Sequence, residues 1–262
     1  MSPHLRIVSS AAFALALAIG PVGATLASAK ADNSAPRVPV LLELFTSEGC
    51  SSCPPADALL EKLDHTQPFH NVDLIVLSEH VDYWDALGWK DRFSSSQFTA
   101  RQYDYAQKID PTSGSYTPEL VVDGRAGMVG SDWDAVSAAI EHARAVRKHP
   151  MSITRVSRLG HSVKLHVDAA APGMNGVVLY VAVADDHVST HVARGENAGR
   201  TLSHVAVVRT LMLAGAVSSQ RAIDQDVTVP LPDGANTNGM RIVAFTQDQR
   251  TGTVLSLASG SL

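Results

Sequence analysis

The two cysteines of this 262-residue chain, Cys50 and Cys53, are three positions apart and are the only ones it has. An apolar run at residues 38–45 precedes them, and residues 54–63, with leucines at helical spacing, follow. The run predicts a buried strand and the following segment predicts a helix. Because a helix N-terminus carries partial positive charge, it favours a thiolate. The Cys-x-x-Cys pair therefore predicts thiol–disulfide chemistry at a strand–helix junction, with a Cys50–Cys53 disulfide as the oxidised form.

The first residues predict export. A weakly basic start is followed by an apolar stretch at residues 11–27, and Ala27-Ser-Ala29 is a small-x-small cleavage site. We therefore expect residues 1–29 to be a secretory signal peptide and the mature protein to be periplasmic or secreted. An uncleaved anchor is the alternative, but Gly20 and Pro21 interrupt a stretch that is short for a bilayer span. We expect residues 30–37 to be a disordered lead-in, and no later segment is apolar enough to span a membrane.

Composition narrows the class of protein. The net charge of −5 argues against a general nucleic-acid binder, and no basic run with interleaved aromatic residues is present. One cysteine pair in a chain of this length is too little for the disulfide framework of a small secreted domain. The chain is long enough to bury a core of its own, so we expect one large or two small domains.

The first half of the mature chain alternates strands and helices. A second apolar run at residues 72–77 makes residues 38–77 a predicted strand–helix–strand unit with a parallel sheet. We expect a helix from the serines at 94–96 to about residue 109. A strand at 116–124 and a hairpin partner at 126–130 follow, and Ser131 is expected to cap a helix over residues 132–148.

Pro150 marks a change of pattern. After it the chain predicts strands separated by turn residues, at residues 152–158, 162–168, 177–184, 204–213, 227–231, 241–247 and 253–257. This rhythm predicts a β-sandwich domain over residues 150–262, beside an α/β domain over residues 38–149.

The order of these features resembles the thioredoxin superfamily. More specific phrases resemble a narrower group, the bacterial secreted family known as domain of unknown function 1223; they are Phe45-Thr-Ser-Glu-Gly-Cys-Ser-Ser-Cys-Pro-Pro-Ala-Asp57, His80-Val-Asp-Tyr-Trp-Asp85 and Tyr116-Thr-Pro118. The resemblance implies a thioredoxin-like α/β domain with a helical insertion, followed by the β-sandwich. It also implies a cis-proline at Pro118 beside the Cys-x-x-Cys loop.

The resemblance assigns roles to these residues. Cys50, expected to be the more exposed cysteine, attacks, and Cys53 resolves the mixed disulfide. Pro118 is the third residue assigned to catalysis, and Thr117, His80 and Trp84 are expected to line the substrate groove. The expected partners are an exported thiol or disulfide substrate and a redox partner, and no cofactor or metal is expected.

Two other functions fit the same cysteines. A permanent disulfide that stiffens the loop would suit a binding or scaffold protein. Cys50, Cys53 and His80 together could ligate Cu(I), because soft thiolates suit that ion, although His80 is more simply interpreted as part of a hydrogen-bonded cap.

Two further segments of the second half are interpreted as loops without a functional role. Residues 195–199 contain two glycines but do not follow a strand–helix pattern, so we interpret them as a flexible loop of the β domain and not as a phosphate site. His187 and His191 are interpreted as part of a polar surface loop.

Overall fold

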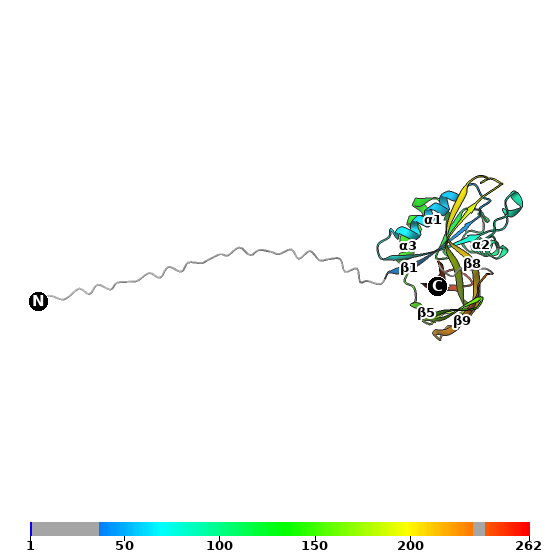
Figure 1. Cartoon of the computed structure of the whole chain (residues 1–262). Helices are drawn as coiled ribbons and strands as arrows, with labels where there is room; N and C mark the ends of the chain where they lie inside the picture. Colours follow the sequence, from blue (N-terminus) through cyan, green and yellow to red (C-terminus); the bar gives the residue numbers. More distant parts are fainter. Residues whose placement is uncertain (2–36, 233–238) are drawn as a thin grey trace. The chain divides into compact units, whose positions relative to one another are not determined.

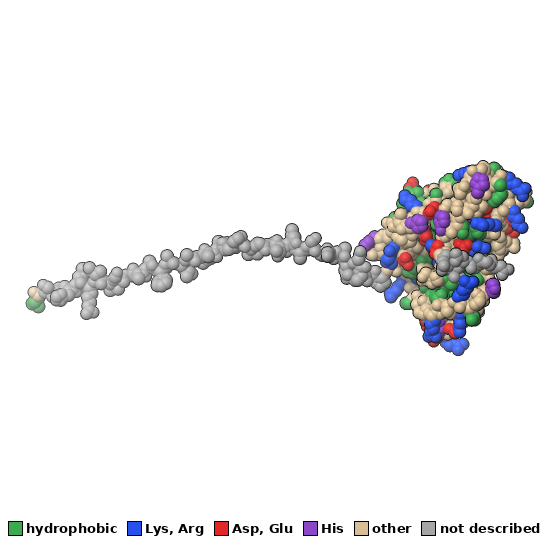
Figure 2. Space-filling view, in the orientation of Figure 1, with side chains coloured by type: hydrophobic (Ala, Val, Ile, Leu, Met, Phe, Trp, Pro, Cys, Tyr) green, Lys and Arg blue, Asp and Glu red, His purple; other side chains and the backbone are tan. Residues whose placement is uncertain are grey.

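The computed structural model describes Met1, residues 37–232 and residues 239–262. The predicted signal peptide, except for Met1, and nearly all of the predicted lead-in lie outside the described residues. Within the described part, no helix is long and apolar enough to cross a membrane. Basic and acidic side chains are intermixed on the face drawn in Figure 2, in keeping with the modest net charge of −5.

A mixed sheet of eight strands forms the centre of the fold, with the order β11-β10-β7-β8-β2-β1-β3-β4 (Figure 1). Its strands are β1 (Val38–Thr46), β2 (Val72–His80), β3 (Glu119–Val122), β4 (Ala126–Val129), β7 (Val177–His191), β8 (Thr201–Val217), β10 (Met240–Asp248) and β11 (Val254–Ser261). A second sheet has the order β5-β6-β9 and consists of β5 (Met151–Leu159), β6 (Ser162–Ala169) and β9 (Ile223–Pro230).

The predicted strand–helix–strand unit is present. Strands β1 and β2 are parallel, with Val38 opposite Val72 and Thr46 opposite His80, and helix α1 (Pro54–Thr66) connects them. Alternate residues of β1 face opposite layers: Leu42 and Leu44 pack toward α1, whereas Phe45 packs against Tyr105 on the other side. Burial of both faces explains why the sequence of β1 is almost entirely apolar, and its one acid, Glu43, is buried in an ion pair with Arg101.

Two further helices cover the sheet. Helix α2 (Ser96–Ile109) begins after Ser95, whose side chain accepts from the Gln97 N–H, and it lies between β2 and β3 as the sequence predicted. Helix α3 (Trp133–Arg144) packs beside α1. Its cap is Asp132, which accepts from the Ala135 N–H, and not Ser131, and it ends at Arg144 before the predicted residue 148. A short 3₁₀ helix, η1 (Asp85–Leu87), follows β2.

The predicted fold class is wrong. Strands β7, β8, β10 and β11 were expected in a separate β-sandwich, but they belong to the same sheet as β1 and β2. Strand β8 joins β2 in parallel at the pair Ser78 and Val207. The three-stranded sheet buries Leu165 and Val229 against Val181 and Ile242 of the large sheet, so it packs on a sheet that also contains β1 and β2 of the first half of the chain. The fold is therefore not a thioredoxin-like domain followed by an independent β domain.

A long hairpin of β7 and β8 extends past the rest of the sheet. The two strands stay paired up to His191 and Thr201, whereas β10 accompanies β7 only as far as Asp185. Residues 186–191 and 201–206 thus form a two-stranded arm, drawn in yellow at the top of the molecule in Figure 1. His187 and His191 lie on this arm and not in a loop, contrary to our interpretation of the sequence.

Candidate active site

The two cysteines lie between the end of β1 and the start of α1, where they form a disulfide. The S–S distance is 2.15 Å and the two Cα atoms are 5.4 Å apart. Both Cys50 and Cys53 are 0% exposed, while Ser51 and Ser52 between them are exposed. The expectation that Cys50 would be the more exposed cysteine is therefore wrong for this state of the protein.

The start of α1 determines how the helix can act on the sulfurs. Cys53 is the N-cap, and Pro54 and Pro55 occupy the first helical positions, so they contribute no N–H groups. The N–H groups of Ala56 and Asp57 bond to the Cys53 carbonyl. The nearest polar partner of the Cys50 sulfur is instead the hydroxyl of Ser52, with Sγ and Oγ 3.3 Å apart.

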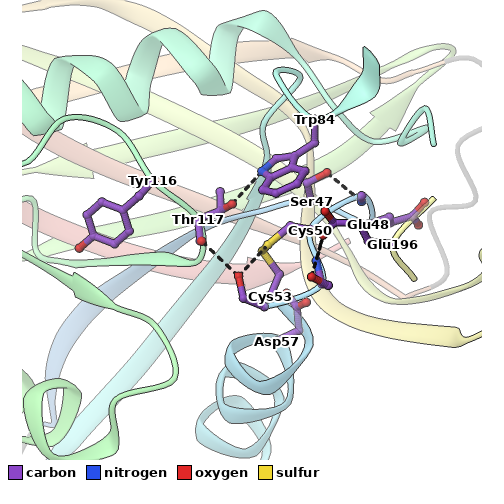
Figure 3. Close-up of a disulfide and its surroundings, with 12 residues drawn as sticks. Ser47, Glu48, Cys50, Cys53, Asp57, Trp84, Tyr116, Thr117 and Glu196 are labelled. Carbon is purple, nitrogen blue, oxygen red and sulfur yellow. Dashed lines mark hydrogen bonds between the residues drawn. A yellow bond between two sulfur atoms is a disulfide. The ribbon is translucent and has the colours of Figure 1, made fainter. Parts of the chain in front are cut away.

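The Thr117–Pro118 step lies beside the disulfide loop, and its peptide bond is cis. The Thr117 carbonyl is 3.5 Å from the Ser52 hydroxyl, which donates to it. The indole N–H of Trp84 donates to the Thr117 hydroxyl at 2.8 Å. The structure therefore brings Trp84 and Thr117 to the loop, and both are visible around the disulfide in Figure 3.

His80 is buried and does not line an open groove. Its side chain is 0% exposed, and its Nδ1 lies 2.6 Å from Oδ2 of Asp91. Burial lowers the pKa of His80, but the charge and hydrogen bond of Asp91 and the charges of Asp57 and Glu48 outweigh it, so the pKa lies above its ordinary value. The ring contacts those of Phe93 and His204, with centroids 5.5 Å and 4.8 Å away.

A group of buried acids and histidines lies against the base of the disulfide loop. We call this group the inner polar cluster; it comprises Glu48, Asp57, His80, Asp91 and His204, and each residue is at most 4% exposed. Five of its atoms have no hydrogen-bond partner, namely Glu48 Oε1, Asp57 Oδ1, His80 Nε2 and both ring nitrogens of His204. Asp57 Oδ1 and His204 Nδ1 are 3.4 Å apart. Buried polar groups without partners are rare and often mark reactive sites.

Asp57 connects this cluster with the cysteines. It lies four residues after Cys53 on α1, so both side chains are on one face of the helix. Figure 3 shows Asp57 directly beside Cys53. His204 comes from β8, in the second half of the chain, and Asp57 and His204 were both missed by the sequence analysis. The i+4 spacing of Cys53 and Asp57 was the available signal for the carboxylate.

The tip of the β7–β8 arm also reaches the disulfide loop. We call residues 192–200 the strap. Its Asn197 is 0% exposed and donates through Nδ2 to the carbonyls of Glu48 and Cys50, at 3.0 and 2.9 Å. Its Glu196 accepts from the N–H and the hydroxyl of Ser51, at 3.2 and 2.7 Å. The segment that we interpreted as a flexible loop of the β domain is thus part of the site.

A possible cation-binding group lies elsewhere. Among the residues that the structure describes, the ligand atoms of His166, Asp168 and Asp224 converge to within 4.8 Å on the three-stranded sheet. His166 also contacts Asp226, with Nδ1 and Oδ1 2.8 Å apart. Cys50, Cys53 and His80 do not form such a group of converging ligand atoms.

Comparison with known proteins identifies the family. A family described as a protein of unknown function, DUF1223, matches residues 41–247. The chain belongs to this family. It also resembles a solved crystal structure of a protein from Agrobacterium tumefaciens, with a TM-score of 0.62 and 27% sequence identity over 87% of this chain and 96% of that one. No curated protein matches the chain.

The extent of the DUF1223 match agrees with the architecture. It begins at Leu41 in β1 and ends at Gln247 in β10, so it covers the disulfide loop, the inner polar cluster and the strap. The DUF1223 region therefore includes strands on both sides of Pro150, in keeping with one sheet built from both halves of the chain.

Proposed function

We propose that this protein is an exported thiol–disulfide oxidoreductase that uses Cys50 and Cys53. The observation that carries the proposal is the inner polar cluster behind the disulfide. Buried acids and histidines with unpaired atoms are more typical of a reactive centre than of a disulfide that only closes a short loop. Asp57 is the member of the cluster closest along the helix to Cys53, His204 lies 3.4 Å from it, and proton transfer at the sulfurs is the role we assign to these two residues.

The chemistry assigns one step to each cysteine. In the reduced protein, the Cys50 thiolate attacks a substrate disulfide, forms a mixed disulfide and releases the first substrate thiolate. The Cys53 thiolate then attacks Cys50 Sγ and releases the second, so the substrate gains two electrons and the protein regains its Cys50–Cys53 disulfide. Reversal of these steps oxidises a dithiol substrate.

Nearby side chains support both steps. The Ser52 hydroxyl lies 3.3 Å from Cys50 Sγ, and in the reduced protein we expect it to turn from the Thr117 carbonyl and donate to the Cys50 thiolate. Cys53 is enclosed, and a buried thiolate is unfavourable, so its proton must pass to a nearby base when it attacks. Asp57, one helical turn behind it, with His204 at 3.4 Å, accepts that proton in our proposal. Thr117 and Trp84 flank the loop on the side where the substrate approaches.

Single-cysteine variants of the mature protein test the proposal. Cys53→Ser retains the attacking thiol but lacks the resolving one, so it should accumulate a mixed disulfide with a peptide disulfide substrate. Cys50→Ser is the matched control and should accumulate none. Trapping by neither variant would contradict the assignment of Cys50 as the nucleophile.

The reduction potential separates this proposal from the scaffold alternative. A Cys50–Cys53 potential between about −120 and −270 mV against glutathione buffers is the range of exchange catalysts. A potential below about −300 mV is typical of structural disulfides and would favour a binding or scaffold protein.

A further inference from the structure

We propose that the strap occupies the place of an extended polypeptide, which displaces it to reach the disulfide. This inference rests on the proposed function and specifies its substrate as a protein segment that contains cysteine. In the structure as described, both cysteines are 0% exposed, so a thiol cannot approach the sulfurs until the surrounding chain moves. The strap is part of that surrounding chain, and it lies between the ends of β7 and β8, outside the sheet.

Beyond the sheet, the two strands of the arm pair only with each other, although the inner part of β8 packs on α1 and its His204 is buried in the inner polar cluster. Strand β10 stops pairing with β7 at Asp185, and β8 meets β2 at Val207 alone. Val205 and Ala206 anchor the base of the arm in the core beneath α1. Toward the strap no third strand joins the pair, and a two-stranded ribbon is marginally stable on its own, so we expect the tip of the arm to move while the base, held also by buried His204, stays fixed.

The strap keeps its own shape when it moves. The Val192 N–H donates to the Arg200 carbonyl at 2.9 Å, and the Gly199 N–H donates to the Val192 carbonyl at 2.8 Å. Arg200 donates to the side-chain oxygen of Asn197 at 2.8 Å. Gly195 has a φ of +83°, and a Cβ there would lie 3.1 Å from the Cβ of Trp89, so only glycine fits the turn without strain. The strap can therefore dock and leave as one unit.

The groups that the strap binds are those that an extended peptide would bind. Asn197 satisfies two backbone acceptors, the carbonyls of Glu48 and Cys50, and Glu196 satisfies one backbone donor, the N–H of Ser51. Displacement of the strap leaves acceptors and a donor within four consecutive residues next to the disulfide. A polypeptide backbone offers both N–H and C=O groups and can replace all three bonds. A thiol of a single residue is too short to replace all three bonds, so it leaves at least the Glu48 carbonyl unpaired, whereas the Cys50 carbonyl keeps the Cys53 N–H as a donor.

Stoichiometric reduction of the disulfide tests this inference. The mature oxidised protein is treated with excess of either the peptide acetyl-Gly-Val-Cys-Val-Gly-amide or the single-residue thiol N-acetylcysteine amide. Alkylation of the freed cysteines and mass spectrometry follow the rate. We expect the peptide to react with the wild-type protein about tenfold faster, or more, because it replaces the bonds that the strap loses.

Strap variants complete the test. Asn197→Ala and Glu196→Ala should accelerate reduction by the single-residue thiol roughly tenfold and reduce the advantage of the peptide. Glu141→Ala removes another exposed glutamate, which pairs with Arg144 on α3; it is the matched control and should react like the wild type. If Asn197→Ala does not fold, the Glu196→Ala variant alone tests whether the strap covers the disulfide.

Two outcomes would overturn the inference. Wild-type rates in both strap variants would show that the strap does not cover the disulfide. Equal rates for the two thiols with the wild-type protein would show that the covered site does not select a polypeptide. Because each measurement follows a single reduction of the protein itself, it remains informative even if the protein catalyses no turnover and the proposed function fails.

Discussion

Replacement of Asp91 by asparagine tests the electrostatics of the inner polar cluster. Asp91 and His80 form a pair with Oδ2 and Nδ1 2.6 Å apart, and both side chains are 0% exposed. Asp91 also accepts from the N–H groups of Glu48 and Phe93. Removal of one member of a buried ion pair leaves the other charge unpaired and costs about 3–5 kcal/mol. We expect Asp91→Asn to lower the free energy of unfolding by about this amount near pH 6.

The pH dependence follows from the two pKa values. Burial raises the pKa of Asp91, but the charge and hydrogen bond of His80 and the backbone N–H groups lower it to about 2. The pKa of His80 lies above its ordinary value despite burial, chiefly because of Asp91. The carboxylate therefore stabilises the fold above about pH 3.9 and loses this effect as the pH falls toward 2. The imidazolium stabilises it fully below about pH 6.5 and loses this effect as the pH rises through the folded-state pKa.

Urea denaturation of the oxidised mature protein at pH 5, 7 and 9, followed by tryptophan fluorescence, measures both effects. The difference between the wild type and Asp91→Asn should be largest at pH 5 and smaller at pH 9. Asp226→Asn is the matched control, because the Asp226 carboxylate that lies 2.8 Å from His166 is about half-exposed, and its loss should change stability less than that of Asp91. An equal loss at pH 5 and pH 9, or a loss below about 1 kcal/mol, would refute an ionised Asp91–His80 pair.

Two further predictions concern the proton acceptor and the packing of the sheet. Asp57→Asn should slow release of a trapped substrate by Cys53 about 100-fold and leave the attack by Cys50 nearly unchanged in stopped-flow assays, because Asp57 lies behind Cys53. Equal slowing of both steps would contradict this role. Gly124→Ala should lower the thermal midpoint far more than Gly160→Ala, because a Cβ at Gly124 would meet the Gly252 carbonyl oxygen at 1.9 Å whereas one at Gly160 meets nothing within 4 Å. Both glycines have positive φ, so similar thermal midpoints for the two variants would mean that the loss of stability comes from backbone strain alone and not from the clash with Gly252.

The elements near the cysteines could be predicted because their causes are local. Strand β1 is an apolar run since Leu44 and Phe45 are buried on opposite faces of the sheet. The start of α1 is marked by Pro54 and Pro55, which suit the first turn of a helix. The same local reasoning could not find the end of β7, because its outer residues, such as His187 and Ser189, are exposed and polar on a strand that extends past the sheet.

The fold class could not be predicted because the partner of each strand is set by backbone hydrogen bonds and by packing against residues far away in the sequence. A strand such as β8 has the same apolar pattern whether it pairs in a separate sandwich or beside β2. The join rests on a single pair, Ser78 and Val207, and on the packing of Val205 and Ala206 beneath α1. None of these residues carries a signal of its partner, so a regular series of strands was assigned to a domain of its own.

The same long-range join explains why the sequence predicted only half of the candidate site. Cys50, Cys53, Thr117 and Trp84 belong to short phrases that suggest their own chemistry. Asn197 and His204 reach the disulfide loop only because the β7–β8 arm belongs to the sheet of β1 and β2, which places residues 147 positions apart within hydrogen-bond distance. An independent β domain could be removed without changing the chemistry of the cysteines. In this fold, loss of the arm removes both the strap, which binds the disulfide loop, and the histidine that lies 3.4 Å from Asp57, so the second half of the chain is part of the candidate site itself.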